Sequence, residues 1–469
     1  MILRAVLITG ALLSACGPAP IEVQKPLQTP ARLTDTNLDP TVVEVRLAAG
    51  PSTAQFLDGK DADVWAFRDA AIEGSLGTVP GPVLHAKAGD LVIVHFKNDL
   101  PESTTIHWHG LRLPAVMDGS TSVQTTIEPG KEFEYRFTVR DPGSFWYHPH
   151  VRADVQIERG LYGAFVVEGG TEVDAAADRY FVLDDVKVDS TGKLTEGVDV
   201  LDEMLGRQGN VLLVNGQRGR EIEVAAKSRE RWRFVNSANG RYFNLRLPGV
   251  KFRVIGWDGG LIPEPYEVDT LLVAPGERYE VLVEIPDQRG ERLQLETIHY
   301  DRGHNIPDPG PKEILGVVVR PARDVAPKPL PTQWRTDLQQ LALTADTRVQ
   351  TFVLKEVETP EGVQFLINDQ RWPFNTHVEV RQNDVEIWEV KNEAEMDHPF
   401  HLHGHFFHVL SVNGEPFTRK GWKDTVNIPM EGTVRFAVKY EPSPGMWMFH
   451  CHILEHAERG MMGDLMIMP

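Results

Sequence analysis

Residues 143–150 read Gly-Ser-Phe-Trp-Tyr-His-Pro-His, and residues 445–452 read Gly-Met-Trp-Met-Phe-His-Cys-His. Each stretch starts with a glycine, continues through aromatic or apolar residues and ends in two histidines one residue apart. Aromatic-rich runs of this length favour β-strands, in which residues i and i+2 point to the same face. The two stretches therefore predict a related strand in each half of the chain, with two imidazoles on one side of it.

Two other elements recur in the same order. Lys97-Asn98 is followed by His107-Trp-His-Gly110, and Lys391-Asn392 is followed at the same interval by His401-Leu-His-Gly404. A middle copy begins at Val235-Asn236 but has no histidine at this offset. A glycine turn before a strand occurs at Pro129-Gly130, Pro275-Gly276 and Glu431-Gly432. This repetition predicts three related domains, of which the middle one spaces the outer two.

Short runs of β-branched and aromatic residues, separated by Gly, Pro, Asn and Asp, dominate the chain, and no long helical pattern is convincing. This pattern is typical of all-β sandwiches or barrels. We expect domains at residues 40–170, 178–320 and 345–469, with an extended proline-rich linker at 321–344.

The composition of the 469 residues, 41% hydrophobic and 25% charged, is that of a soluble globular protein. The chain has 48 Lys and Arg residues against 67 Asp and Glu residues, a net charge of −19. This balance argues against a general affinity for nucleic acid or for an anionic membrane surface.

The first residues have the features of an export signal. Arg4 precedes an apolar run that is too short to span a bilayer. The quartet Leu13-Ser-Ala-Cys16 resembles a bacterial lipobox, so we expect residues 1–15 to be a lipoprotein signal peptide, with Cys16 lipidated and residues 16–39 forming a flexible tether. The alternative is an ordinary signal peptide with a chance cysteine. We expect a monomer on the periplasmic side of a bacterial cell envelope. The lipid would be its only contact with the membrane.

Cys451 is the only cysteine besides Cys16. A disulfide within the folded domains is therefore excluded, and either chemistry or burial must explain Cys451.

Histidine pairs are the strongest chemical signal in the chain. Its 17 histidines form five His-X-His pairs, whereas random placement would give about 0.6. The pairs are His107/His109, His148/His150, His401/His403, His403/His405 and His450/His452. Imidazoles without a matching set of carboxylates suit copper or zinc better than calcium or magnesium. We interpret the isolated histidines as packing or surface residues (His85, His95, His299, His304, His377) and His405 and His408 as supporting or packing neighbours.

Cys451, His456 and Met461 follow one another at intervals of five residues, and His398 lies earlier in the same domain. Two imidazoles, one thiolate and a thioether define a blue-copper electron-transfer site. A zinc site with these ligands is the alternative, but structural zinc prefers more thiolate. Met461 could also be strand packing, because Met462, Met466 and Met468 lie close by.

Four motifs resemble the copper signatures of the three-domain multicopper oxidases, which include laccases and bacterial cuprous oxidases. They are His107-Trp-His-Gly, His148-Pro-His, His398-Pro-Phe-His-Leu-His-Gly and the segment from His450 to Met461. The resemblance implies three cupredoxin-like Greek-key domains and four copper ions, with the trinuclear cluster between domains 1 and 3. A type 1 copper would be held by His398, Cys451, His456 and Met461, and a type 2 copper by His107 and His401. The two type 3 ions would be held by His109, His148 and His452, and by His150, His403 and His450.

The implied reaction takes one electron at a time from a reductant and reduces dioxygen to two water molecules. Asp118 resembles the acidic residue that supplies protons near the type 2 copper, although it could be a turn residue before Gly119. Many bacterial relatives have Glu after the type 1 histidine, where this chain has Ala457. Glu455 or Glu458 is a possible substitute in the proton route.

The resemblance leaves the reductant open. A laccase-like oxidase of phenols or aromatic amines is the leading hypothesis, and the second is a metallo-oxidase of Cu(I) or another metal ion. The metallo-oxidase hypothesis rests on four residues that precede His398 and could hold a metal ion close to the type 1 site: Glu393, Glu395, Met396 and Asp397. The alternative is that they form a solvated acidic loop. A non-catalytic envelope or cell-division scaffold is the third, but such proteins are expected to have lost copper ligands, and this chain retains all of them.

Overall fold

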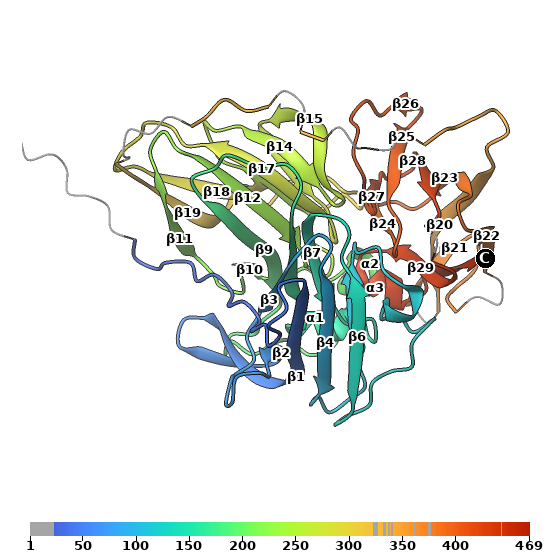
Figure 1. Ribbon diagram of the computed structural model, residues 1–469, viewed down its shortest axis with the longest axis horizontal. Coiled ribbons are helices and arrows are strands. Elements are labelled where there is room, and N and C mark those ends of the chain that lie inside the picture. The colour runs from blue at the N-terminus through green and yellow to red at the C-terminus, as the bar shows by residue number, and fades with distance from the viewer. Residues whose placement is uncertain are drawn as a thin grey trace, which may run out of the picture.

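The structure is a computed structural model, and it describes residues 23–321, 327–331, 334, 335, 338, 341–360, 362–373, 377–441 and 443–469. The strands of this described part form six sheets, two in each of three sandwich domains. In Figure 1, domain 1 is blue to teal, domain 2 is green to yellow, and domain 3 is orange to red. The predicted all-β fold of three domains is therefore confirmed. The signal peptide, Cys16 and parts of the 321–344 linker lie outside the described residues.

Domain 1 has sheets β2-β1-β4-β6 and β3-β8-β7-β5. Its elements are β1 (Val42–Leu57), β2 (Lys60–Asp69), β3 (Gly81–Lys87), β4 (Leu91–Asn98), β5 (His107–His109), the 3-10 helix η1 (Ala115–Met117), β6 (Glu132–Thr138), β7 (Gly143–His148), α1 (Ala153–Glu158) and β8 (Gly163–Glu168).

Domain 2 has sheets β10-β9-β12-β17-β14-β15 and β11-β19-β18-β13-β16. Its elements are β9 (Asp178–Val186), α2 (Val200–Leu205), β10 (Val211–Val214), β11 (Arg220–Ala225), β12 (Arg229–Asn236), β13 (Phe243–Arg246), β14 (Phe252–Trp257), β15 (Gly260–Val268), β16 (Thr270–Val273), β17 (Arg278–Glu284), β18 (Arg292–Ile298) and β19 (Lys312–Arg320).

Domain 3 has sheets β21-β20-β23-β28-β25-β26 and β22-β30-β29-β24-β27. Its elements are β20 (Val349–Thr359), β21 (Gly362–Ile367), β22 (Val378–Arg381), β23 (Val385–Asn392), β24 (His398–Leu402), β25 (Phe407–Val412), β26 (Glu415–Pro416), β27 (Thr425–Ile428), β28 (Thr433–Lys439), β29 (Gly445–Cys451), α3 (Leu454–Glu458) and β30 (Met462–Met468).

The repeated asparagine explains why the three domains share one pattern. Asn98, Asn236 and Asn392 each end a strand, and each accepts a hydrogen bond from the backbone N–H two residues later. Their amide groups donate to the carbonyls of Ile127, Val273 and Ile428. A buried amide with all its bonds made fixes the turn after the strand. The same residue therefore performs the same structural task in each domain.

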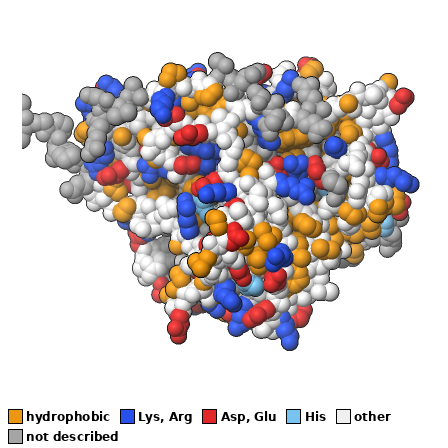
Figure 2. Space-filling view, in the orientation of Figure 1, with side chains coloured by type: hydrophobic (Ala, Val, Ile, Leu, Met, Phe, Trp, Pro, Cys, Tyr) orange, Lys and Arg blue, Asp and Glu red, His pale blue; other side chains and the backbone are white. Residues whose placement is uncertain are grey.

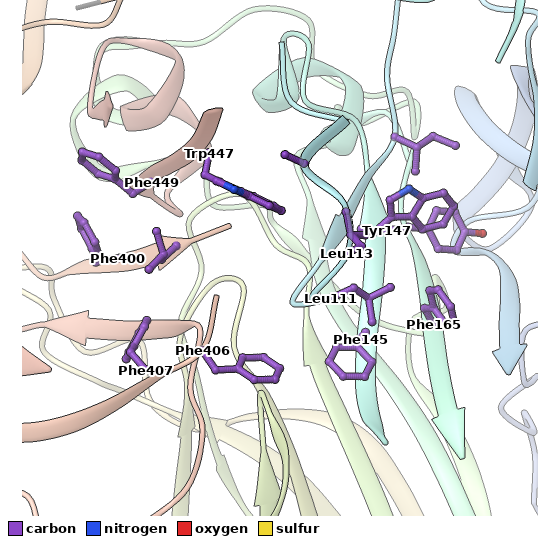
Figure 3. Packing of buried hydrophobic residues seen from close by; sticks show 14 of the residues in the cluster. Leu111, Leu113, Phe145, Tyr147, Phe165, Phe400, Phe406, Phe407, Trp447 and Phe449 are labelled. Carbon is purple, nitrogen blue, oxygen red and sulfur yellow. The ribbon is translucent and has the colours of Figure 1, made fainter. Parts of the chain in front are cut away.

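Domains 1 and 3 share one hydrophobic core. A single cluster of buried side chains includes Phe145 and Phe165 of domain 1 and Phe400, Trp447 and Phe449 of domain 3. Figure 3 shows the domain 3 side chains facing Leu111 and Leu113 of domain 1 across the boundary. Burial of this apolar surface holds the two domains in a fixed relation, as a site shared between them requires.

The predicted flexible tether is wrong for its described part, residues 23–39. Leu27 N–H donates to Glu221 O in β11 at 2.8 Å, and Leu33 N–H donates to Val83 O in β3 at 2.9 Å. Leu33 is also buried. The segment pairs with exposed strand edges of domains 2 and 1, which supply backbone partners that a prediction from composition overlooks.

No helix among the described residues is long and apolar enough to cross a membrane. On the face seen in Figure 2, basic and acidic side chains are intermixed rather than gathered into a basic surface.

Candidate metal centres

Eight buried histidines from domains 1 and 3 meet in one interdomain space. His107 on β5 lies opposite His148 on β7, and His401 on β24 lies opposite His450 on β29. The other four are His109, His150, His403 and His452. Rings from the two domains stack: His107 on His403, and His109 on His401, each with centroids 3.8 Å apart. The site is therefore closed only when both domains are in place.

The ligand atoms gather in overlapping groups in which all atoms lie within 4.8 Å of one another. Three of these groups consist of histidines alone: His107/His401/His403, His107/His109/His148 and His150/His403/His450. The ring of His452 lies 5.0 Å from that of His109 and 5.8 Å from that of His148. The third group is a predicted type 3 set, whereas the first adds His403 to the predicted type 2 pair and the second has His107 in place of His452.

The hydrogen bonds of these histidines show which nitrogens face the shared space. Nδ1 of His107, His148 and His401 each donates to a backbone carbonyl at 2.9 Å. Nε2 of the same three rings has no hydrogen-bond partner among the described residues. Burial lowers the pKa of His148 and His401 below the usual value, so these two rings are neutral. Neutral imidazoles with unpartnered, converging nitrogens fit copper ions.

Asp118, which the sequence singled out, lies inside the site. Its Oδ2 accepts from Nδ1 of His403 at 2.9 Å, and its Oδ1 lies 3.3 Å from Nδ1 of His107. Burial alone would raise the pKa of Asp118, but His403 and His107 hold it well below its usual range. The carboxylate therefore touches one ring from each domain.

Three of the four predicted type 1 ligands, His398, Cys451 and His456, form a second group within domain 3. Nδ1 of His398 lies 3.4 Å from Cys451 Sγ and 3.2 Å from Nδ1 of His456. Met461 is buried, and its carbonyl accepts from the N–H of Cys451 at 3.0 Å. Burial raises the pKa of the Cys451 thiol, so a bound cation is the natural partner for its thiolate.

Both type 1 histidines are fully buried. Nε2 of His456 donates to the carbonyl of Met204 in α2 at 3.1 Å, and Phe365 stacks on the His456 ring at 3.8 Å. Domain 2 therefore covers the outer edge of His456.

A line of polar groups runs from solvent to His398. Nε2 of His398 lies 3.4 Å from Glu356 Oε1, and Nε2 of His304 lies 3.3 Å from Glu356 Oε2. Nδ1 of His304 lies 3.8 Å from Oε2 of Glu395, whose side chain is 84% exposed. The assignment of His304 as an isolated packing residue therefore misses its place beside the site. No sequence signal links it to Glu356, because the two residues come from different domains.

The acidic segment before His398 divides into an exposed and a buried part. Glu395 is in solvent, as a solvated loop would be, and Met396 is buried. Asp397 is buried and accepts hydrogen bonds from Tyr300 Oη at 2.6 Å, from Asn427 Nδ2 at 2.6 Å and from a backbone N–H. Its carboxylate oxygens are therefore already used by the fold.

Glu455 and Glu458 lie on α3, and in the sequence they flank the predicted type 1 ligand His456. Glu455 accepts from Asn239 Nδ2 at 2.8 Å, and Glu458 accepts from Ala153 N–H at 2.7 Å. Burial raises the pKa of both carboxyls to about 7. Ala457 is buried in an apolar cluster with Met448 and Met462.

The remaining histidines have local partners. His85 and His95 lie beside Glu168 and Glu44, at 3.2 and 2.7 Å. His405 packs edge-on against Trp447, and His408 stacks on Trp422. His377 lies 3.7 Å from Glu379, and the carbonyl of His299 accepts from Asn244.

Sequence profiles of multicopper oxidase domains match residues 54–172, 184–292 and 338–469. Multicopper oxidase mco of Staphylococcus epidermidis is 30% identical over 409 residues, which cover 84% of this chain and 83% of that protein. The chain belongs to the multicopper oxidases. Membership of this family makes it a copper-binding oxidoreductase that uses dioxygen and a reductant.

Two further relatives bear different functional names. A laccase of Bacillus subtilis is 26% identical over 458 residues, covering 83% of this chain and 88% of the laccase. A multicopper oxidase of Campylobacter jejuni, described as a metallo-oxidase, has a solved structure that superposes with a TM-score of 0.84. It is 28% identical and covers 96% of this chain and 97% of its own.

Proposed function

We propose that this multicopper oxidase binds four copper ions and reduces dioxygen to two water molecules with electrons taken singly from a reductant. The ligand sets are those predicted from the sequence. The observation that carries the proposal is the convergence of unpartnered histidine nitrogens beside a separate His398/Cys451/His456 group. When bound, the copper ions would supply the one-electron redox chemistry and the dioxygen-binding positions.

The chain connects the two sites through consecutive residues. Cys451 is bonded through the backbone to His450 and His452, and Nδ1 of His450 donates to the carbonyl of Cys451 at 2.8 Å. Covalent and hydrogen bonds therefore join a type 1 ligand to ligands of both type 3 ions.

Asp118 is the proposed proton-holding group, because it alone among the three predicted acids contacts histidines of the cluster. Glu455 and Glu458 are proposed to buffer protons on the α3 side, since neutral and charged forms of a carboxyl with a pKa of about 7 coexist near neutrality. Because Ala457 has no ionisable group, this second proton route would depend on Glu455 and Glu458.

The geometry favours a small metal cation, such as Cu(I) or Fe(II), as the reductant. Both type 1 histidines are fully buried, and Phe365 already covers one face of His456, so an aromatic reductant from solvent has no exposed ring to stack on. Glu356 and His304 instead offer an oxygen and a nitrogen ligand next to Nε2 of His398. A carboxylate and an imidazole suit first-row metal ions. Exposed Glu395 provides a negative charge at the outer end of this line.

A phenolic or aromatic reductant is the second candidate. A cavity of about 250 Å³ is lined by Tyr242, Tyr300, Arg241, Arg302 and Lys312, among others, and no carboxylate belongs to its lining. The cavity therefore has a positively charged lining in a chain of net charge −19, and this lining favours an anionic aromatic molecule. Tyr300 also contacts Asp397, the residue before His398.

One experiment tests the oxidase and separates the two reductants. The copper-loaded protein should contain about four copper ions per chain, show a blue absorption band and consume dioxygen. Glu356→Gln should lower oxygen uptake with Cu(I) or Fe(II) by about tenfold and leave uptake with an anionic phenol unchanged. Lys312→Glu should have the reverse effect. Absence of copper binding and of the blue band would refute the assignment as an oxidase. A loss of activity in Glu356→Gln that is confined to the phenol would refute a metal cation as the reductant.

We also propose export to the periplasmic side of the bacterial envelope as a monomer anchored through lipid on Cys16. The lipobox-like quartet that ends at Cys16 supports this proposal. The mass of the N-terminal peptide from the native host tests it, since lipidation adds acyl chains to Cys16 and an ordinary signal peptide adds none.

A further inference from the structure

Domain 2 has none of the copper-ligand motifs, but one of its turns reaches the eight-histidine site. Gly276 has a φ of +82°, and a Cβ atom at this position would lie 2.7 Å from the ring of His452. The glycine of the repeated Pro-Gly element therefore permits close contact with a predicted type 3 ligand. Two residues later, β17 begins with Arg278, which is fully buried.

The guanidinium of Arg278 connects all three domains. Nη1 and Nη2 each donate to the carboxylate of Asp424 in domain 3 at 2.6 Å. Nε donates to the carbonyl of Ser144 in domain 1 at 3.1 Å, and Nη2 also donates to the carbonyl of Asp258 in domain 2 at 3.0 Å. Only glycine fits at Gly110, which follows the first His-X-His pair, because a side chain there would overlap the guanidinium.

Asp424 in turn contacts two predicted copper ligands. Its backbone carbonyl accepts from Nδ1 of His401 at 2.9 Å, and its Oδ1 lies 3.4 Å from Nε2 of His109. Thr425 Oγ1 donates to the same Oδ1 at 2.9 Å and lies 3.0 Å from Nδ1 of His401. His401 and His109 come from different domains, and their rings are stacked. Asp424 therefore sets the orientation of a stacked pair that spans the domain boundary.

We infer that Arg278 is a positioning residue for the trinuclear site, supplied by the domain that has no copper ligands. By holding Asp424 with two parallel charge-assisted bonds, it fixes the rings of His401 and His109 and keeps their other nitrogens directed at the metal positions. This inference rests on the proposed assignment of His401 to the type 2 ion and His109 to a type 3 ion. Without the guanidinium, Asp424 is a buried charge with an unmatched carboxylate, which must rotate toward other donors.

A matched pair of variants tests the inference. Arg278→Met removes the positioning guanidinium. Arg233→Met removes a second buried arginine, which bonds to Ser144, Asp178 and Glu280 but to no predicted ligand. We expect Arg278→Met, in the copper-loaded protein, to lose at least half of the type 2 electron paramagnetic resonance signal or to change its hyperfine splitting. The blue band of the type 1 site should keep its intensity, and Arg233→Met should keep both signals.

Two other variants maintain the test if Arg278→Met does not fold. Asp424→Asn keeps the backbone carbonyl and the size of the side chain but weakens the bonds to Arg278 and His109, so it should change the type 2 signal. Arg278→Lys keeps the charge but not the two parallel donors of the guanidinium, and it should retain a larger share of the type 2 signal than Arg278→Met. A type 2 signal in the Arg278 or Asp424 variants equal to that of Arg233→Met overturns the inference. Absence of copper in the unsubstituted protein would instead refute the proposed function.

Discussion

The two predicted copper regions are assembled differently. The type 1 ligands all come from domain 3, and three of them lie within residues 451–461. The eight histidines of the other region come equally from domains 1 and 3, so neither domain can form that site alone. Both regions are nevertheless completed by domain 2, through Met204 beside His456 and Arg278 beside Asp424. The ligands of each site follow from short motifs, whereas its surroundings depend on how the domains pack.

Replacing Cys451 should have the largest effect. Cys451→Ser removes the only thiolate in either region, so the blue band should be lost and oxygen consumption should cease. The eight-histidine site shares no ligand with the type 1 site, so the type 2 resonance signal and roughly three copper ions per chain should remain. Metal analysis and electron paramagnetic resonance measure both. Loss of all copper would show that the two regions are not independent.

Asp118→Asn should affect only the interdomain region. The substitution keeps the shape of the side chain but removes the charge that His403 and His107 contact. We expect the rate of oxygen reduction to fall by about 10- to 100-fold, with an unchanged rate of type 1 reduction by the reductant. Stopped-flow absorbance of the blue band separates the two steps. Ser120→Ala, a change at a buried side chain nearby in the sequence, is the control, and equal losses in both variants would contradict the role of Asp118.

His304→Gln should affect only the type 1 region, and less strongly. The change weakens the proposed cation position while leaving Glu356 beside His398. We expect kcat/KM for Cu(I) to fall by about threefold to tenfold, mainly through KM, with phenol oxidation unchanged. His377→Gln, at a half-exposed histidine on the surface, should leave both activities unchanged. An equal effect on the two reductants would indicate a general disturbance of the site.

The smallest expected effect is on stability. Burial raises the pKa of Glu455 from 4.5 to about 7, so the folded protein holds a proton there that the unfolded chain releases above pH 4.5. The free energy of unfolding should therefore fall as pH rises from about 5 to 7, by up to about 3 kcal/mol for this group. Urea unfolding of the copper-free protein should show a weaker decline in Glu455→Gln. The exposed Glu73→Gln should keep the full decline, and identical slopes would contradict the assignment.

Much of the fold could be predicted because the chain repeats itself. Asn98, Asn236 and Asn392 mark the same turn in three domains, and their hydrogen bonds are equivalent. The N-terminal segment could not be predicted in this way. Its composition is that of a flexible tether, but the backbone pairing of Leu27 and Leu33 depends on strand edges far away in the sequence.

The repeated motifs were enough to predict the family, the three-domain β fold and the residues proposed to bind copper, because a strand places alternate side chains on one face and the motifs recur in order. The surroundings of those residues became apparent only in the folded structure. Glu356 and His304 lie beside His398, and Arg278 and Asp424 lie beside His401, although no spacing connects them in the sequence. The physical reason is that hydrogen bonds and buried ion pairs act over a few ångströms in space, and contacts between domains are fixed only when the separate cores pack together.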